Sequence, residues 1–220
     1  MDLALISNWD LPFFVRAWTV LRAMKRLDDN PGDRAAQRAF MLCLDRHDLE
    51  NRLAYLRSTE DGRALLRARP TLDERQLSVA KLMTYPEGSF GRAMASFFTQ
   101  WKIEPFPASD VTPRDEIEWV AQRVADSHDC LHVAAGYGAD SSGEVEVHAF
   151  MWAQWKPPTT FLVLLFGIAM SVWAIGVRKT WQRFWAAWRR GKQSPFVEDA
   201  HWERLLPLPL EEVRARLGLR

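Results

Sequence analysis

The sequence predicts an all-α protein, a single multi-helix domain that covers residues 1–220. Apolar residues recur at helical spacing along most of the chain, whereas the alternating pattern of a half-buried strand is scarce. We find no internal repeat and no low-complexity tract, and 220 residues are enough to bury a full core. We therefore expect one helical domain, with an apolar helix and an amphipathic helix rich in Trp and Arg near its C-terminal end.

Prolines and turn residues divide the first hundred residues into helical segments. Pro12 begins a helix that reaches Leu27, and the turn residues 28–32 end it. Further helices are predicted over the ranges 33–50, 60–68, 72–83 and 88–100. The segment 104–111 contains two prolines and is predicted to be a loop.

A long helix is predicted after this loop. Thr112 and Pro113 are typical of a helix start, an N-cap hydroxyl followed by a proline in the first turn. The apolar residues that follow lie on one helical face, which predicts a single helix that ends at Gly136. They are Ile117, Val120, Ala121, Val124, Leu131 and Ala135. After a Gly-rich turn, a second helix begins at Ser141 and reaches about residue 155.

Residues 157–177 contain no charged side chain. The apolar part proper, 161–177, is 17 residues long, at the short edge of what spans a bilayer. The nearby cations all follow this segment, so the positive-inside rule would place the large N-terminal part outside the cell. We therefore favour a helix that is buried in the core or lines an apolar cavity over one that spans a membrane.

The next helix, over residues 178–192, is amphipathic. Trp181, Trp185 and Trp188 follow one another at intervals of four and three residues, and arginines lie on both sides of them. This pattern suits a helix whose tryptophans face a membrane interface with anionic lipids. The same pattern fits a tryptophan stripe that packs on the core with solvated arginines, and the sequence leaves both interpretations open.

Charge and cysteine content exclude several classes of protein. Lys and Arg number 29 and Asp and Glu 28, so the chain lacks the positive field of a dedicated nucleic-acid binder. Residues 151–197, however, carry seven basic side chains and no acidic one, which predicts an anionic surface or ligand. Cys43 and Cys130 cannot form a disulfide framework, and residues 1–14 show no secretory signal, so we expect a reducing compartment.

Two histidines and two carboxylates form the strongest chemical pattern. His128 and His132 are four residues apart on one helical face, the spacing at which two imidazoles bind one metal ion. Asp129 follows the first histidine, and Glu144 lies twelve residues after the second, on the next helix. Together they would form a mixed nitrogen and oxygen site for a divalent metal. His148 is a candidate for a further ligand or for a hydrogen-bond partner of one.

Simpler interpretations exist for parts of this pattern. Ser141 and Glu144 have the spacing of a capping box, which would explain the glutamate without a metal. Buried histidines can also be ordinary hydrogen-bonded core residues. A second His-Asp pair, His47 and Asp48, raises a metal-dependent phosphohydrolase of the HD type, although the spacing of its other ligands does not fit.

The segment HDCLHVAAGYGADSSGE at 128–144 fits the pattern HDxxH, eleven residues, then Glu. It resembles the ubiquinone-biosynthesis family known as "Coq four". Three other segments are similar to that family: YPEGSFGRAMASFF at 85–98, RVADSHD at 123–129 and HWERLLPLPLEEVRARLG at 201–218. The resemblance covers residues 60–220, and the N-terminal helical region 1–59 contributes little to it. Family members often have an Arg-Glu pair where this chain has Ala125 and Asp126.

The resemblance implies an all-helical peripheral membrane protein that binds a divalent metal, zinc before manganese or iron. The residues that match the family's ligands are His128, Asp129, His132 and Glu144, and Asp129 and Glu144 are the candidate catalytic proton donors. The implied reaction removes the C1 carboxylate of a polyprenylated 4-hydroxybenzoate precursor of ubiquinone, with C1 hydroxylation in an oxidative version. The alternative is a non-catalytic, prenyl-lipid-binding organiser of the same pathway.

The resemblance also implies partners and a location. The partners are the polyprenylated aromatic substrate, an anionic membrane surface and other ubiquinone-biosynthesis proteins, with no nucleic acid. The location is the cytoplasmic face of the inner (plasma) membrane of a bacterium. The sequence is compatible with a homodimer and does not determine the oligomeric state.

Overall fold

The computed structural model describes residues 12–30, 32–108 and 113–219, and these confirm the all-α fold. No strand forms among them, and one isolated backbone bridge pairs Ser89 with Pro209. The helices of the first half are α1 (Phe13–Asp29), α2 (Arg34–Leu44), α3 (Arg46–Ser58), α4 (Glu60–Ala68), α5 (Glu74–Leu77), α6 (Val79–Leu82) and α7 (Phe90–Trp101). Those of the second half are α8 (Glu116–Asp126), α9 (His128–Ala135), α10 (Ser141–Gln154), α11 (Pro158–Ile175), α12 (Val177–Gln193), α13 (Trp202–Leu205) and α14 (Leu210–Arg216).

Several predicted helices are divided in two. The segment 33–50 breaks at Asp45, whose side chain accepts hydrogen bonds from Thr159. The predicted helix 112–136 breaks at Ser127, whose N–H group reaches the carbonyl oxygens of both Arg123 and Ala125 and tightens the turn. The predicted cap Thr112 lies outside the described residues, and Asp115 caps α8 instead by accepting from the N–H of Glu118.

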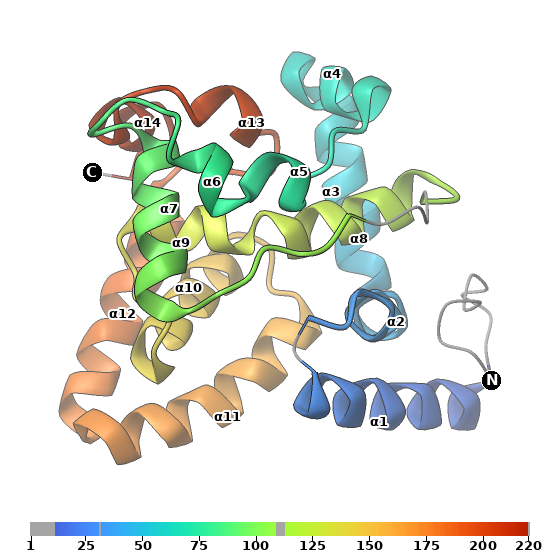
Figure 1. The fold of residues 1–220 in the computed structure, drawn as a ribbon. Coiled ribbons are helices and arrows are strands. Elements are labelled where there is room, and N and C mark those ends of the chain that lie inside the picture. Colours follow the sequence, from blue (N-terminus) through green and yellow to red (C-terminus); the bar gives the residue numbers. More distant parts are fainter. Residues whose placement is uncertain (1–11, 31, 109–112, 220) are drawn as a thin grey trace.

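The main hydrophobic core lies around α10, which packs against α9, α11 and α12 (Figure 1). Its large buried side chains come from α7, α10 and the C-terminal segment, and include Phe90, Met94, Phe98, Phe150 and Leu206. A second core joins α3, α4 and α8, and a small third one joins α1 and α2. The second half of the chain therefore surrounds α9 and α10, the two helices that carry the predicted ligands.

Helix α11 is mostly exposed, so the expectation that residues 161–177 are buried in the core is wrong, whereas the alternative that they line an apolar cavity holds for Val163. Only 22% of its 18-residue window is buried, and its mean hydropathy of 1.9 makes it, by length and composition, a helix that could cross a membrane. Leu164 and Ser171 face the protein, whereas Phe166 and Trp173 are exposed. Helix α11 packs against α10, α12 and α2 along one side only, and its other side is exposed.

Helix α12 combines the two interpretations of its tryptophan stripe. Phe184 and Ala187 are buried in the main core, and Trp188 is partly buried against it. Trp181 and Trp185 are exposed. The packing face of α12 therefore includes one end of the stripe, and the other two tryptophans remain available to a membrane interface.

Candidate metal centre

Three predicted ligands converge on one point between α9 and α10. The Nε2 atoms of His128 and His132 lie 3.0 Å apart. Glu144, in the first turn of α10, brings Oε1 to 3.3 Å from His132 Nε2 and Oε2 to 3.5 Å from His128 Nε2. All three side chains thus offer a ligand atom to one small volume. The sequence pattern correctly predicted that a turn between two helices would bring them together.

The spacing of these atoms fits a small divalent metal. A tetrahedral ion with bonds of about 2.1 Å holds its ligand atoms about 3.4 Å apart. The measured separations of 3.0, 3.3 and 3.5 Å are close to that value. Two imidazole nitrogens and one carboxylate form a ligand set that suits zinc and other divalent metals. The residues present therefore fit a metal, although its identity is open.

Local sequence explains why Glu144 is in place. Gly136 adopts a left-handed conformation (φ 76°) and ends α9. Asp140 then caps α10 by accepting hydrogen bonds from the N–H groups of Ser142 and Gly143. The N-cap is thus Asp140 and not Ser141, so the capping-box explanation of Glu144 is wrong. Its side chain faces the histidines instead.

The electrostatics of the cluster favour an anionic glutamate. Burial alone would raise the pKa of Glu144, but hydrogen bonds from His128 and His132 outweigh it and hold that pKa well below its usual range. Burial opposes the charged form of His128, yet the hydrogen bond and charge of Glu144 raise its pKa. Burial, with the charge of His128, lowers the pKa of His148 to about 3. The lowered pKa keeps the imidazole of His148 neutral, which is the form that binds metals.

Asp129 and His148 differ in their position. The carboxylate of Asp129 is not among the converging atoms, and burial raises the pKa of this group. His148 brings its Nε2 to 3.7 Å from Glu144 Oε2, and its ring lies 5.3 Å from that of His128. His148 therefore lies beside the three converging side chains, whereas the sequence indicated it only as a candidate further ligand or hydrogen-bond partner. Asp129 as a ligand stays a prediction.

A cavity of about 1090 Å³ leads to the cluster. His128, Asp129 and His148 line it beside the cluster, and most of the remaining wall is apolar, although five other charged residues also line it: Asp45, Asp48, Arg52, Lys102 and Glu104. The apolar wall includes Phe40, Met41, Ile103, Phe106, Met151 and Val163. This volume is at the upper end of the usual range for small-molecule sites, about 300–1,000 Å³. The arrangement can hold a largely apolar ligand with one polar end at the histidines.

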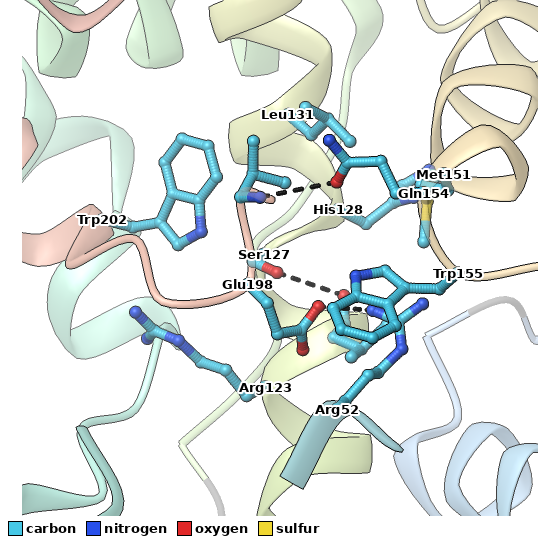
Figure 2. A pocket seen from close by; sticks show the side chains of 12 residues that line it. Arg52, Arg123, Ser127, His128, Leu131, Met151, Gln154, Trp155, Glu198 and Trp202 are labelled. Carbon is cyan, nitrogen blue, oxygen red and sulfur yellow. Dashed lines mark hydrogen bonds and ion pairs between the residues drawn. The ribbon is translucent and has the colours of Figure 1, made fainter. Parts of the chain in front are cut away.

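The cavity also contains a buried ion-pair network that the sequence analysis missed. Arg52 pairs with Asp48 at 2.6 Å and with Glu198, and all three side chains are buried. Figure 2 shows the pair of Arg52 and Glu198 in a smaller pocket that His128 also lines. The available signal was the i, i+4 spacing of Asp48 and Arg52. His47 is exposed and Asp48 belongs to this network, so the two do not form an HD-type site.

Known proteins resemble this chain both in fold and in sequence. A crystal structure of a protein from Nostoc punctiforme PCC 73102, provisionally named as a ubiquinone biosynthesis protein, superposes with a TM-score of 0.70. The match covers 93% of this chain and 97% of that one at 21% identity, and it shows a shared fold. "Ubiquinone biosynthesis protein COQ4 homolog, mitochondrial" of Bos taurus is 31% identical over 162 residues. The corresponding protein of Pyrenophora tritici-repentis is 30% identical over 165 residues.

These two alignments each cover 72% of this chain, but 61% of the bovine protein and 55% of the fungal one. The chain thus spans little more than half the length of these curated relatives. A sequence model of the family "Coenzyme Q (ubiquinone) biosynthesis protein Coq4" matches residues 44–220, which include all the converging side chains. The chain therefore belongs to the Coq4 family of coenzyme Q (ubiquinone) biosynthesis proteins.

Proposed function

We propose that this protein is a metal-dependent enzyme of ubiquinone biosynthesis that removes the C1 carboxylate from a polyprenylated 4-hydroxybenzoate at a membrane surface. The observation that carries the proposal is the convergence of His128, His132 and Glu144, together with the large, mostly apolar cavity that His128 lines. A prenylated aromatic acid has the matching shape, with an apolar body and one anionic end. Family membership supports the pathway, and the cavity supports the class of substrate.

In this proposal His128, His132 and Glu144 hold a divalent metal, with His148 or Asp129 as a further ligand. The bound metal supplies Lewis-acid stabilisation of the negative charge on the substrate. The apolar cavity wall binds the ring and the first part of the prenyl tail, and it excludes water. The substrate carboxylate is thereby oriented toward the histidines.

The bond between C1 and the carboxylate carbon then breaks, carbon dioxide leaves, and the electron pair stays on the ring. A proton must be delivered to C1 to complete the product. Asp129 is the better placed donor, because it lines the cavity while both oxygens of Glu144 face histidine nitrogens. The oxidative version consumes dioxygen and water, leaves a hydroxyl group on C1 and releases carbon dioxide and hydrogen peroxide, so the two versions give products of different mass.

The surface of the second half of the chain supports membrane attachment. Helix α11 exposes Phe166 and Trp173, and α12 exposes Trp181 and Trp185. Helix α12 carries six basic side chains and no acidic one. Exposed aromatic residues beside cations are typical of a helix at the interface of an anionic bilayer. A substrate with a polyprenyl tail is itself confined to membranes, which supports this location.

The test is turnover of a short-chain 3-prenyl-4-hydroxybenzoate by metal-loaded protein, followed by mass spectrometry of the product. We expect loss of the carboxylate with the unchanged protein and with His47→Ala, an exposed histidine outside the cluster. His132→Ala should show no turnover while it retains its helical circular dichroism. Full turnover by His132→Ala would refute the proposal. Bound prenyl lipid without turnover by the unchanged protein would favour the organiser of the pathway.

A further inference from the structure

Helix α1 has two apolar faces, only one of which packs on the protein. Thr19 and Ala23 are buried against α2, together with Val20 and Leu27. The opposite face exposes five large apolar side chains, Phe13, Phe14, Trp18, Leu21 and Met24, with exposed fractions of 73, 83, 61, 60 and 46%. We call these five residues the outer face of α1. A contiguous exposed apolar patch marks an interaction site, because leaving it in water is unfavourable.

The C-terminal end of α1 contributes to the wall of the cavity. Leu27 and Asn30, at the C-terminal end of α1, line the same cavity as Thr160 and Val163 of α11. Figure 1 shows α1 and α11 along the same edge of the molecule. Both helices expose apolar and aromatic residues there. Two apolar surfaces thus flank one cavity, which favours a broad apolar partner over a single docked helix.

The charge around these surfaces indicates the chemistry of that partner. Helix α1 carries four basic side chains, Arg16, Arg22, Lys25 and Arg26, against Asp28 and Asp29, and Arg26 also pairs with Asp33; four basic less three acidic groups give +1. Helix α12, which follows α11, adds six cations and no acidic residue. An apolar surface with a cationic rim complements a bilayer, whose acyl chains accept the aromatic residues and whose anionic headgroups attract the cations.

We propose that the outer face of α1 binds an anionic lipid bilayer, and that the protein rests on the membrane through α1 as well as α11. Helix α1 precedes residues 44–220, the range that matches the family model. The inference rests on the membrane location in the proposed function and is independent of the reaction. Both helices contribute to the cavity wall, which favours entry of a membrane-bound ligand beside them.

The experiment measures binding of the full chain to phosphatidylethanolamine vesicles that contain phosphatidylglycerol. The test variant is the double substitution Phe14→Glu and Trp18→Glu, and a second variant, Trp173→Glu, alters α11. The matched control is Met83→Glu, which adds a charge at an exposed methionine after α6. We expect the double variant to weaken binding by about tenfold or more, since it removes two aromatic side chains from the interface. Met83→Glu should bind like the unchanged protein.

Each other outcome has a defined meaning. If the double variant binds as well as the unchanged protein while Trp173→Glu does not, the proposal for α1 is overturned and the membrane location stands. If the unchanged protein binds no vesicles, both the proposal for α1 and the membrane location are overturned. Equal binding to vesicles of phosphatidylcholine alone would overturn the inference that the bilayer must be anionic. Light scattering after gel filtration tests whether a second copy of the chain covers the outer face of α1 instead. If the unchanged protein is a dimer and the double variant is a monomer that still binds vesicles, that face is a dimer interface and the proposal is overturned.

Discussion

Arg214 donates a hydrogen bond from Nε to the carbonyl oxygen of Ala134, at 3.0 Å, across 80 residues of sequence. Arg190 of α12 makes the equivalent bond to the carbonyl oxygen of Ala135 at 2.6 Å. Two guanidinium groups therefore cap the C-terminal end of α9, where the helix dipole favours positive charge. Because α9 carries His128 and His132, the C-terminal segment of the chain fixes the helix that holds the candidate ligands.

Arg214→Ala should lower the free energy of unfolding by about 1.5–3 kcal/mol, since it removes a charged donor from a carbonyl that packs inside the protein. Urea unfolding followed by circular dichroism measures the change. The control is Arg216→Ala, two residues on, whose exposed side chain pairs only with Glu212 in α14. That variant should change stability by less than about 1 kcal/mol. Equal effects of the two substitutions would contradict the capping role of Arg214.

His132→Ala should lose the bound metal while the fold remains. The side chain is 1% exposed and its Nε2 lies within 3.0–3.3 Å of the other two candidate ligand atoms, so the site cannot form without it. Elemental mass spectrometry of protein purified without chelator or nickel resin should give one metal per chain. His47→Ala, in an exposed residue of α3, should keep the full amount. A folded, unsubstituted protein without metal would refute the site and reduce the histidines to core residues.

The sequence predicted element type better than element boundaries. Helix 60–68 was predicted at its observed bounds, because both of its ends are set by local contacts: the Thr59 hydroxyl accepts from the N–H of Gly62, and the N–H of Arg69 donates to the carbonyl oxygen of Leu65. The break at Asp45 could not be predicted, since its partner Thr159 lies 114 residues away. The exposure of α11 was also missed, because composition alone does not distinguish a core helix from one at the surface.

The candidate site was predictable where its geometry is local. The spacing of His128 and His132 on one helix, and the short turn to Glu144, place these side chains together without any distant contact. The network of Arg52, Asp48 and Glu198 was missed because 146 residues separate Arg52 from Glu198. Arg190 and Arg214 were missed as caps for the same reason. Long-range partners leave no periodic signal in a single sequence.

Gly143→Ala should disturb the placement of Glu144. A Cβ atom at residue 143 would lie 1.8 Å from the carbonyl oxygen of Gly138, a backbone atom that cannot move independently. We expect a loss of about 1–3 kcal/mol of stability together with weaker metal binding. Thermal unfolding and metal titration measure the two effects. Gly167→Ala is the control, because its Cβ would meet only Val145 Cγ2 at 3.4 Å and alanine favours a helix interior. Normal metal binding by Gly143→Ala would show that the turn tolerates movement.

The buried carboxyl of Asp45, which accepts hydrogen bonds from Thr159, should make the free energy of unfolding depend on pH. Burial raises the pKa of Asp45 to about 6, against hydrogen bonds from Thr159 that lower it. Between pH 4 and pH 6 the folded protein therefore keeps a proton that the unfolded chain has released, and this group costs stability as the pH rises through that window. The full cost is present above pH 6 and amounts to at most about 3 kcal/mol.

Asp45→Asn removes this titration. Its free energy of unfolding, relative to the unsubstituted protein, should therefore increase from pH 4 to pH 6 and stay constant above that, as measured by urea unfolding at each pH. Thr159→Val is the companion variant: it removes the hydroxyl donor to Asp45, so the pKa of the carboxyl should rise further and the window should extend above pH 6. A constant difference between Asp45→Asn and the unsubstituted protein across the whole range would contradict the raised pKa, because only a group with different pKa values in the two states changes stability with pH.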